Sequence, residues 1–398
     1  MRFCPPWRAA AAVGLLASSL PAIQSSTQEE TPPTQVFVLG MLHDGHLESE
    51  DWDLAAVRET IRRIDPDVVC PEIPPDRWPA AEALWRTERR VEDERILQFP
   101  EYVEALMPLL DEMDFAVAPV AGWRAEIAAY RDMRIQAFAA EDEFADAHRD
   151  YLAAQDWVAA WLAAHEVRAS DEALHLHSPA YDRRMKGELG PYEHYLGDVI
   201  GRPAGWQYIN QEHFVLIERA IRHHAGQRLL ITFGAGHKYW FLEQLKNMPD
   251  VEVIDVRPFL PGRDGWRASA TQRAREAFDA GIDDIETWRA LMRGDALMAW
   301  ERIEGWLALE GEAQEAMLAT LAEQKGRVAS EFMGRMWYGR PFVRLHPADG
   351  RVELEVEVHY AMEDEPAGMI RATLVPDAAR PHGYAWTRLE LPEPRADG

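Results

Sequence analysis

Two histidines and one glutamate of this chain each follow a short apolar segment. His43 stands three residues after Gly40, His237 stands three residues after Gly234, and Glu72 follows a third apolar run and a proline. Two imidazoles and one carboxylate suit a divalent transition metal and leave a coordination position for water. A metal in such a position makes water nucleophilic at neutral pH. The three residues therefore predict a metal-assisted hydrolytic centre, in which Glu72 is either a ligand or a general base.

The glycines beside the histidines have reasons of their own. Gly40 and Gly234 let the backbone turn tightly after an apolar run, and Gly236 removes a side chain next to the second histidine. We expect all three to border a bound cofactor. A dinucleotide site is a weaker interpretation, because Tyr239 occupies the position of the third glycine in GxGxxG. In a further alternative, each histidine is a loop residue that is hydrogen-bonded to the backbone. The recurrence of GxxH after two separate apolar runs argues against this alternative.

Other polar residues near these runs are weaker candidates. His46 lies in the same loop as the first histidine and would add a ligand, a base or a substrate contact. Arg124 follows another apolar run, where it would meet an anionic group of a substrate; the alternative is a surface ion pair. His175 and His177 lie in residues 170–202, which are rich in glycine, histidine and tyrosine. We expect that segment to be irregular and lid-like, and its histidines to be lid residues or solvated loop residues.

The elements that must position these residues follow an α/β pattern. Short apolar runs rich in β-branched and aromatic residues predict buried strands over residues 36–39, 68–70, 115–120, 229–233 and 251–256. Helical periodicity predicts helices over residues 54–64, 79–96, 101–112, 124–167, 206–225 and 239–246. This order predicts an α/β fold: a largely parallel or mixed central sheet flanked by helices, with a long helical insertion. Ligands of such sheets bind at the carboxyl ends of the strands, where His43, Glu72 and His237 fall.

The pattern changes after residue 261. Residues 262–338 predict a helical connector made of short helices punctuated by glycine. Residues 339–398 predict a small antiparallel β module, because Val352, Leu354 and Val356 alternate with glutamates and so form a strand with one buried face. Its predicted partner strands cover residues 369–375 and 384–391.

The N-terminus has the composition of a secretory signal. Arg2 and Arg8 precede an apolar segment and a group of small residues, which predicts a signal peptide over residues 1–26. Residues 27–34 predict a flexible leader. The apolar segment is too short for a durable membrane span. We therefore expect a secreted or periplasmic protein without a stable transmembrane span after signal removal.

Charge narrows the class of partner. The formal net charge is −26, with 68 acidic and 42 basic residues. Nucleic-acid binding needs a clustered Lys/Arg surface, so we expect no nucleic-acid partner. The expected partner is a small-molecule or peptide substrate, and self-association is left open. Of the two cysteines, Cys4 would leave with the signal and Cys70 would remain as a thiol in a buried strand.

The order of these motifs resembles the TraB/TIKI superfamily, which is related to the ChaN-like haem-binding proteins and the erythromycin-esterase-like enzymes. The resemblance covers residues 34–258, within a predicted α/β domain over residues 35–261, and rests on a strand-GxxH, a strand-Pro-Glu and a strand-GxGH motif. Members of the TIKI group are described as metal-dependent proteases. Their motif residues correspond here to Gly40 and His43, to Glu72, and to Gly234 and His237.

One motif of that superfamily is incomplete here. An Arg-Asn pair usually lies in the helix before the last GxxH strand, and this chain keeps Asn210, as an expected substrate-binding residue, without the arginine before it. Gln207 or Arg202 must then substitute for that arginine, or the activity has changed.

The resemblance implies a metal-dependent hydrolase of peptide or ester bonds, with Mn, Co, Zn or Fe as the metal. One alternative is a haem or tetrapyrrole binder with His43 or His237 as the axial ligand. Another is a non-catalytic envelope protein with a degenerate site, an alternative that the missing arginine motivates.

Overall fold

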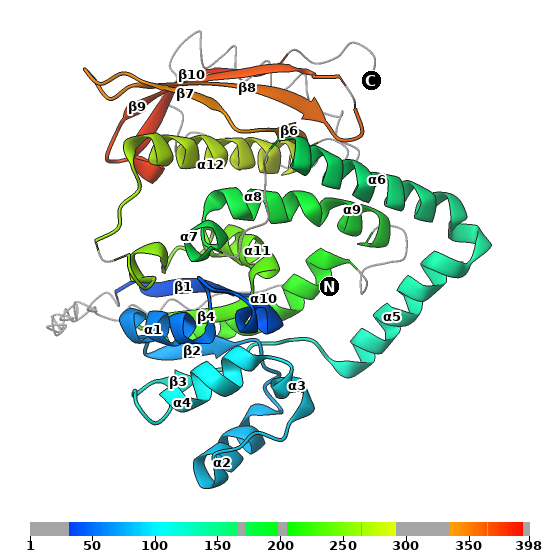
Figure 1. Ribbon diagram of the computed structural model, residues 1–398, viewed down its shortest axis with the longest axis vertical. Helices are drawn as coiled ribbons and strands as arrows, with labels where there is room; N and C mark the ends of the chain where they lie inside the picture. Colours follow the sequence, from blue (N-terminus) through cyan, green and yellow to red (C-terminus); the bar gives the residue numbers. More distant parts are fainter. Residues whose placement is uncertain are drawn as a thin grey trace, which may run out of the picture. The chain divides into compact units, whose positions relative to one another are not determined.

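The strands that precede the two GxxH histidines are neighbours in one parallel sheet. They are β1 (Thr34–Met41) and β4 (Arg228–Gly234), which pair in parallel along their length. The other strands are β2 (Val68–Pro71), β3 (Ala116–Val117) and β5 (Val251–Ile254). The strand order is β3-β2-β4-β1-β5, and the neighbouring strands pair in parallel. Figure 1 labels β1, β2, β3 and β4 of this sheet. The predicted α/β class is confirmed, although β3 is shorter than the predicted strand over residues 115–120.

The computed structural model describes residues 32–165, 172–197, 205–263, 265–291, 335–363 and 365–392. The predicted signal peptide and most of the predicted leader lie outside these residues. None of the helices that the structure describes combines the length and the apolar character needed to cross a bilayer.

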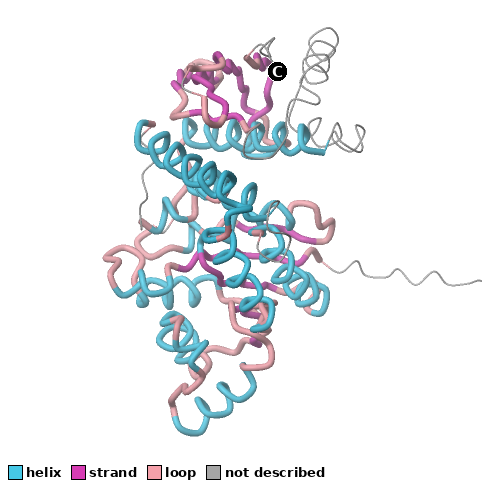
Figure 2. The backbone as a smooth tube through the Cα atoms, turned by 90° about the vertical axis from the view of Figure 1, so that its right-hand side faces the viewer, coloured by secondary structure: helices cyan, strands magenta, loops and turns pink. Residues whose placement is uncertain are grey.

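Helices cover both faces of the sheet (Figure 2). Phe37 and Leu39 of β1 pack on one face with α1 (Leu54–Ile64), whereas Val36 and Val38 pack on the other face with the helices that flank β4. Those two helices are α10 (Trp206–His223) and α11 (Ala235–Leu245). Burial on both faces explains why the strands are almost continuously apolar in sequence.

The polypeptide between β2 and β3 is more interrupted than its periodicity predicts. The predicted helix over residues 79–96 is wrong in its middle, because Arg89 adopts a left-handed conformation with φ 56° and ends the first helix. The helical elements here are α2 (Trp78–Glu88), α3 (Glu94–Leu97), the π-helical turn η2 (Glu101–Leu106) and α4 (Met107–Leu109). The helical insertion after β3 is confirmed as α5 (Ala125–Ala140), η3 (Asp142–Phe144) and α6 (Ala145–Ala164).

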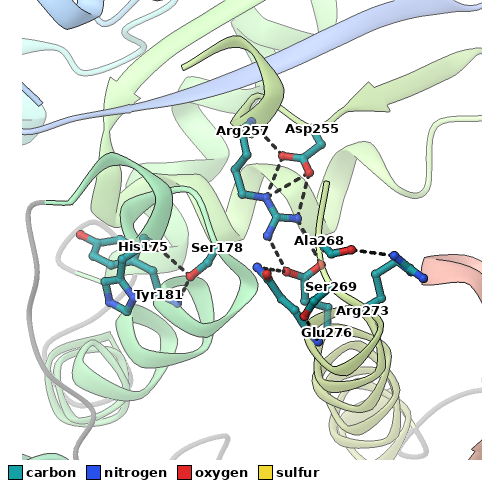
Figure 3. Close-up of polar contacts among 10 residues, drawn as sticks. His175, Ser178, Tyr181, Asp255, Arg257, Ala268, Ser269, Arg273 and Glu276 are labelled. Carbon is teal, nitrogen blue, oxygen red and sulfur yellow. Dashed lines mark hydrogen bonds and ion pairs between the residues drawn. The ribbon is translucent and has the colours of Figure 1, made fainter. Parts of the chain in front are cut away.

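The segment expected to be irregular is mostly helical where the structure describes it. It contains α7 (Ala173–Leu176), α8 (Pro179–Glu188), α9 (Gly190–Tyr192) and the π-helical turn η4 (Glu193–Gly197). Ser178 starts α8: its Oγ accepts from the Tyr181 N–H at 3.2 Å and donates to the His175 carbonyl at 2.7 Å (Figure 3). A serine cap followed by proline is a strong helix start and outweighs the local composition.

The C-terminal part contains one long helix and a second sheet. The described part of the predicted connector is α12 (Ala270–Leu291), a continuous helix rather than a series of short ones. It runs through Gly281 because that residue lies against the Trp386 ring, where a Cβ would come 2.4 Å from Cζ2. Residues 292–334 lie outside the described residues. The antiparallel strands are β6 (Met336–Tyr338), β7 (Phe342–Leu345), β8 (Val352–Tyr360), β9 (Gly368–Pro376) and β10 (Tyr384–Glu390).

Buried arginines connect α12 to preceding elements. The Arg257 guanidinium follows β5 and pairs with Asp255, at 2.9 Å between Nη2 and Oδ2, and with Glu276 of α12 (Figure 3). Arg183 of α8 pairs with Asp279, which also belongs to α12. Each guanidinium is largely buried, and its charge is balanced by a carboxylate in the way that buried charges require.

Candidate functional site

The predicted residues meet at the carboxyl edge of three adjacent strands. His43 follows β1, Glu72 follows β2, and His237 lies in the first turn of α11, directly after β4. The order β2-β4-β1 places these strand ends side by side. The His43 Nε2 and Glu72 Oε2 atoms are 3.8 Å apart. The predicted helix over residues 239–246 begins earlier, at Ala235, so the second GxxH histidine is a helical residue rather than a loop residue.

His43 is held in an unusual conformation by an acid that its motif does not include. Its φ is 54°, an uncommon value for a residue other than glycine and a source of local strain. Its Nδ1–H donates to Glu101 Oε1 at 2.8 Å, and the Glu101 side chain is fully buried. Burial lowers the pKa of His43, but the hydrogen bond and charge of Glu101, together with the charge of Glu72, outweigh it and raise the pKa above its ordinary value. The Nε2 atom is left to face Glu72.

Glu72 is a buried carboxylate with a fixed orientation. Its Oε2 accepts from the Gly234 N–H at 3.0 Å. Its own backbone N–H donates to the Tyr102 hydroxyl at 2.8 Å, and that hydroxyl donates to the Thr232 carbonyl at 2.8 Å. Burial raises the pKa of Glu72, and the positive charge of a protonated His43 ring opposes this shift. A carboxylate with a raised pKa is suited to proton transfer as well as to binding a cation.

His237 has a defined tautomer. Its Nδ1 is 2.7 Å from Asn210 Oδ1, and the Asn210 amide nitrogen donates to the Trp206 carbonyl at 2.9 Å, so the Asn210 oxygen is the acceptor of the His237 proton. Burial lowers the pKa of His237 well below its ordinary value, which keeps the ring neutral. The Trp206 ring stacks on it, with centroids 4.4 Å apart. The Nε2 atom of His237 therefore carries a free lone pair.

The structure adds His213, which the motifs do not single out. Its Nδ1 accepts from the Gly122 N–H at 2.9 Å, and burial lowers its pKa to about 3. A neutral imidazole that accepts through Nδ1 carries its proton on Nε2. The available sequence signal is weak: His213 lies three residues after Asn210, so both project from one buried face of α10.

Two other predicted residues lie apart from this cluster. His46 is buried, but both of its nitrogens are engaged by the backbone: Nε2 accepts from the Leu42 N–H at 2.9 Å, and Nδ1–H donates to the Trp52 carbonyl at 2.7 Å. These bonds give it a role in holding the loop after β1. Arg124 is exposed at the start of α5.

The structure also corrects the expectation for His177. It is a buried residue rather than a solvated loop residue, with an exposed fraction of 6%. Its Nε2 accepts from the Gly40 N–H at 3.0 Å, and its Nδ1–H donates to the Ala173 carbonyl at 2.7 Å. Gly40 allows a close approach at this point, because a Cβ there would lie 3.0 Å from the Ala235 Cβ. The first glycine of the GxxH motif thus packs β1 against α11.

The glycines of the second motif differ in what surrounds them, and this difference is testable. A Cβ on Gly234 would lie 2.7 Å from His43 Nε2, whereas the atoms nearest to a Cβ on Gly236 would be those of Met185 and Trp206, at 3.7 Å or more. Because the clash at Gly234 involves the end of a side chain, we expect Gly234→Ala to fold and to displace His43. The expected loss is about tenfold in metal affinity or hydrolytic activity.

The matched control is Gly236→Ala, which introduces the same methyl group two residues later, at a position where it would make ordinary van der Waals contacts. Circular dichroism verifies folding, and metal titration with a hydrolysis assay measures the effect. Equal values for the two variants would contradict the assigned place of His43.

The donor set of the cluster can be compared with the needs of a metal ion. Among the described residues, Glu72, His213 and His237 have ligand atoms that all lie within 4.8 Å of one another. His213 nevertheless offers an N–H on Nε2 and no lone pair, because the Gly122 N–H occupies Nδ1.

His43 supplies the lone pair that His213 lacks. Its Nε2 is 3.8 Å from Glu72 Oε2, and its Nδ1–H is anchored on Glu101 in the same way that the Nδ1–H of His237 is anchored on Asn210. Histidines that bind metals through one nitrogen usually donate the other N–H to an oxygen in this way. The donor types of His43, Glu72 and His237 suit a divalent transition metal, although the described cluster whose ligand atoms all lie within 4.8 Å of one another contains His213 in place of the predicted His43.

Comparisons with protein-family models, with curated proteins and with solved structures found no match to this chain.

Proposed function

We propose that this protein is a metal-dependent hydrolase of ester or peptide bonds, of the TraB/TIKI-like type. The observation that carries the proposal is the set of hydrogen-bond directions around the cluster. Two histidines anchored through Nδ1 and one carboxylate direct lone pairs into it, and a third histidine directs an N–H into it. Lone pairs are what a cation needs, and a fixed N–H donor is what a developing oxyanion needs.

His43, Glu72 and His237 would hold the metal, which when bound supplies Lewis-acid activation of water at neutral pH. The chain's own residues supply the remaining functions. Water adds to the carbonyl carbon of the substrate, and Glu72 would accept its proton through the carboxylate oxygen that does not hold the metal. The neutral His213 donates its Nε2–H to the carbonyl oxygen as negative charge develops there. The bond to the leaving alcohol or amine then breaks, and Glu72 passes the proton that it accepted from water to that leaving group.

Elemental analysis of the protein, prepared without chelator or affinity tag, tests the ligand assignment. The variants are His43→Ala, His237→Ala and His213→Ala, each checked for folding by circular dichroism and screened against esters and peptides. We expect about one equivalent of Mn, Co, Zn or Fe in the unaltered protein, lost in the first two variants and retained in the third. His213→Ala should bind the metal and hydrolyse slowly, by a factor of roughly 100 to 1000.

The other outcomes each point elsewhere. Metal that is retained in His43→Ala and lost in His213→Ala would reverse the ligand assignment. No metal and no hydrolysis, with a Soret band on haem titration that disappears in His43→Ala or His237→Ala, would replace the hydrolase with the haem-binding alternative. Absence of metal, haem and hydrolysis together would favour a non-catalytic protein with a degenerate site.

A further inference from the structure

Arg95 of α3 lies one aromatic ring away from His43. Its guanidinium carbon is 4.8 Å from the centroid of the Phe99 ring, and that ring lies 4.6 Å from the His43 ring, centroid to centroid. Phe99 is buried and Arg95 is partly buried. The stack therefore holds a cation close to the more exposed of the two proposed histidine ligands.

Arg95 and Arg58 are the arginines of residues 32–95 that have no carboxylate partner within the described part of the chain, and Arg58 donates instead to the Glu104 carbonyl. The Arg95 guanidinium donates to Gln98 Oε1 at 2.9 Å, and no carboxylate of the described residues lies within ion-pair distance of it. The arginines of residues 62–90 each pair with an acid: Arg62 with Glu112, Arg63 with Glu59, Arg77 with Asp93, Arg86 with Glu82, Arg89 with Asp111 and Arg90 with Glu88.

The charge of Arg95 reaches the cluster. Its positive charge acts to lower the pKa of three groups there, His43, Glu72 and His213. Arg124, the arginine that the sequence suggests for an anionic group, is exposed at the start of α5.

We propose that Arg95 binds a carboxylate of the substrate, so that the site selects esters or peptides with one negative charge near the bond that is cleaved. A planar guanidinium matches a carboxylate in geometry and forms two charge-assisted hydrogen bonds with it. A single cation balances one negative charge, and the nearby Glu72 and Glu101 carboxylates disfavour a substrate group of higher charge such as a phosphate dianion. This substrate class rests on the proposed hydrolase function.

A matched pair of esters tests the proposal. The anionic ester para-acetoxybenzoate and the neutral ester para-acetoxybenzamide have the same acyl group and similar leaving groups. We expect kcat/KM of the unaltered protein to be at least about tenfold higher for the anionic ester, because a charge-assisted hydrogen bond contributes that factor or more. Arg95→Gln should bring the ratio of the two values close to one, and Arg95→Lys, which keeps the charge, should give an intermediate ratio.

The ratio cancels any general damage to the site, since both esters report on the same protein sample. Arg86→Gln is the matched control, because it removes an arginine that is paired with Glu82 on α2. It should keep the ratio of the unaltered protein. Equal hydrolysis of both esters by the unaltered protein, or an unchanged ratio in Arg95→Gln, would overturn the proposal.

A second measurement separates failure of this inference from failure of the proposed function. If neither ester is hydrolysed, the hydrolase proposal fails for this class of bond, and the anion site is tested by binding of benzoate and benzamide with calorimetry. Benzoate binding that is at least about tenfold tighter than benzamide binding, and that is lost in Arg95→Gln, would support the site. Equal binding of the two compounds, or no binding of either, would overturn it.

Discussion

Replacing Glu101 with glutamine is expected to lower metal affinity or hydrolytic activity by roughly 100-fold, the upper end of the effect of removing an acid behind a ligating histidine. Glutamine has nearly the same shape and can still accept the Nδ1–H of His43, but it carries no charge. The Glu101 hydrogen bond and charge together raise the pKa of His43 against the opposing effect of burial. Without the charge His43 becomes a weaker base and a weaker ligand.

The same change has a direct spectroscopic consequence. In metal-free protein, the NMR titration of the His43 ring should move to lower pH in Glu101→Gln, because burial, which lowers the pKa, is then less strongly opposed. Glu101 Oε2 has no hydrogen-bond partner in the described part of the chain, so His43 is the group that stabilises this buried carboxylate. Glu104→Gln is the matched control, since it alters an exposed acid of the same turn. Equal behaviour of the two variants would contradict the assigned pairing.

Replacing Gly122 with alanine is expected to reduce the free energy of unfolding by about 3 kcal/mol, the upper range for a side chain forced into a filled space. A Cβ at this position would lie 2.1 Å from the carbonyl oxygen of Glu212 and 2.5 Å from its carbonyl carbon. These atoms belong to the backbone of α10, so no change of rotamer relieves the clash. Either the loop after β3 or the helix has to move.

Urea denaturation measures this loss, with Gly236→Ala as the control. Alanine is favoured over glycine inside a helix by roughly 1 kcal/mol, and the position has only ordinary contacts, so the control should be neutral or slightly stabilised. The Gly122 N–H also fixes the His213 tautomer, and a displaced loop would release it. A loss below about 1 kcal/mol in Gly122→Ala would show that the loop adapts, and that the close approach is not required.

Much of the sheet was predictable from local pattern. The apolar runs before His43, Glu72 and His237 are strands, and the parallel order β2-β4-β1 brings their ends together. This succeeded because strands buried on both faces are continuous apolar runs, and because parallel strands place all their carboxyl ends at one edge. The alternation of Val352, Leu354 and Val356 likewise predicts the half-buried β8.

Interrupted helices were predicted less well, because single residues outweigh periodicity. Arg89 ends α2 by adopting a left-handed conformation, and Ser178 with the following proline starts α8 in a segment whose composition suggests an irregular lid. The long helix α12 passes through Gly281, where packing against Trp386 offsets the low helix propensity of glycine. Each of these outcomes depends on a conformation or contact that periodicity does not contain.

The sequence by itself determined which strand ends carry His43, Glu72 and His237. Only the tertiary structure decided what each imidazole presents to the cluster. Glu101 and Asn210 leave lone pairs on His43 and His237, and Gly122 leaves a proton on His213. At His46, by contrast, hydrogen bonds with the backbone engage both ring nitrogens. The physical reason is that a strand end follows from local pattern, whereas the direction of a hydrogen bond depends on the partner that long-range folding brings to the ring.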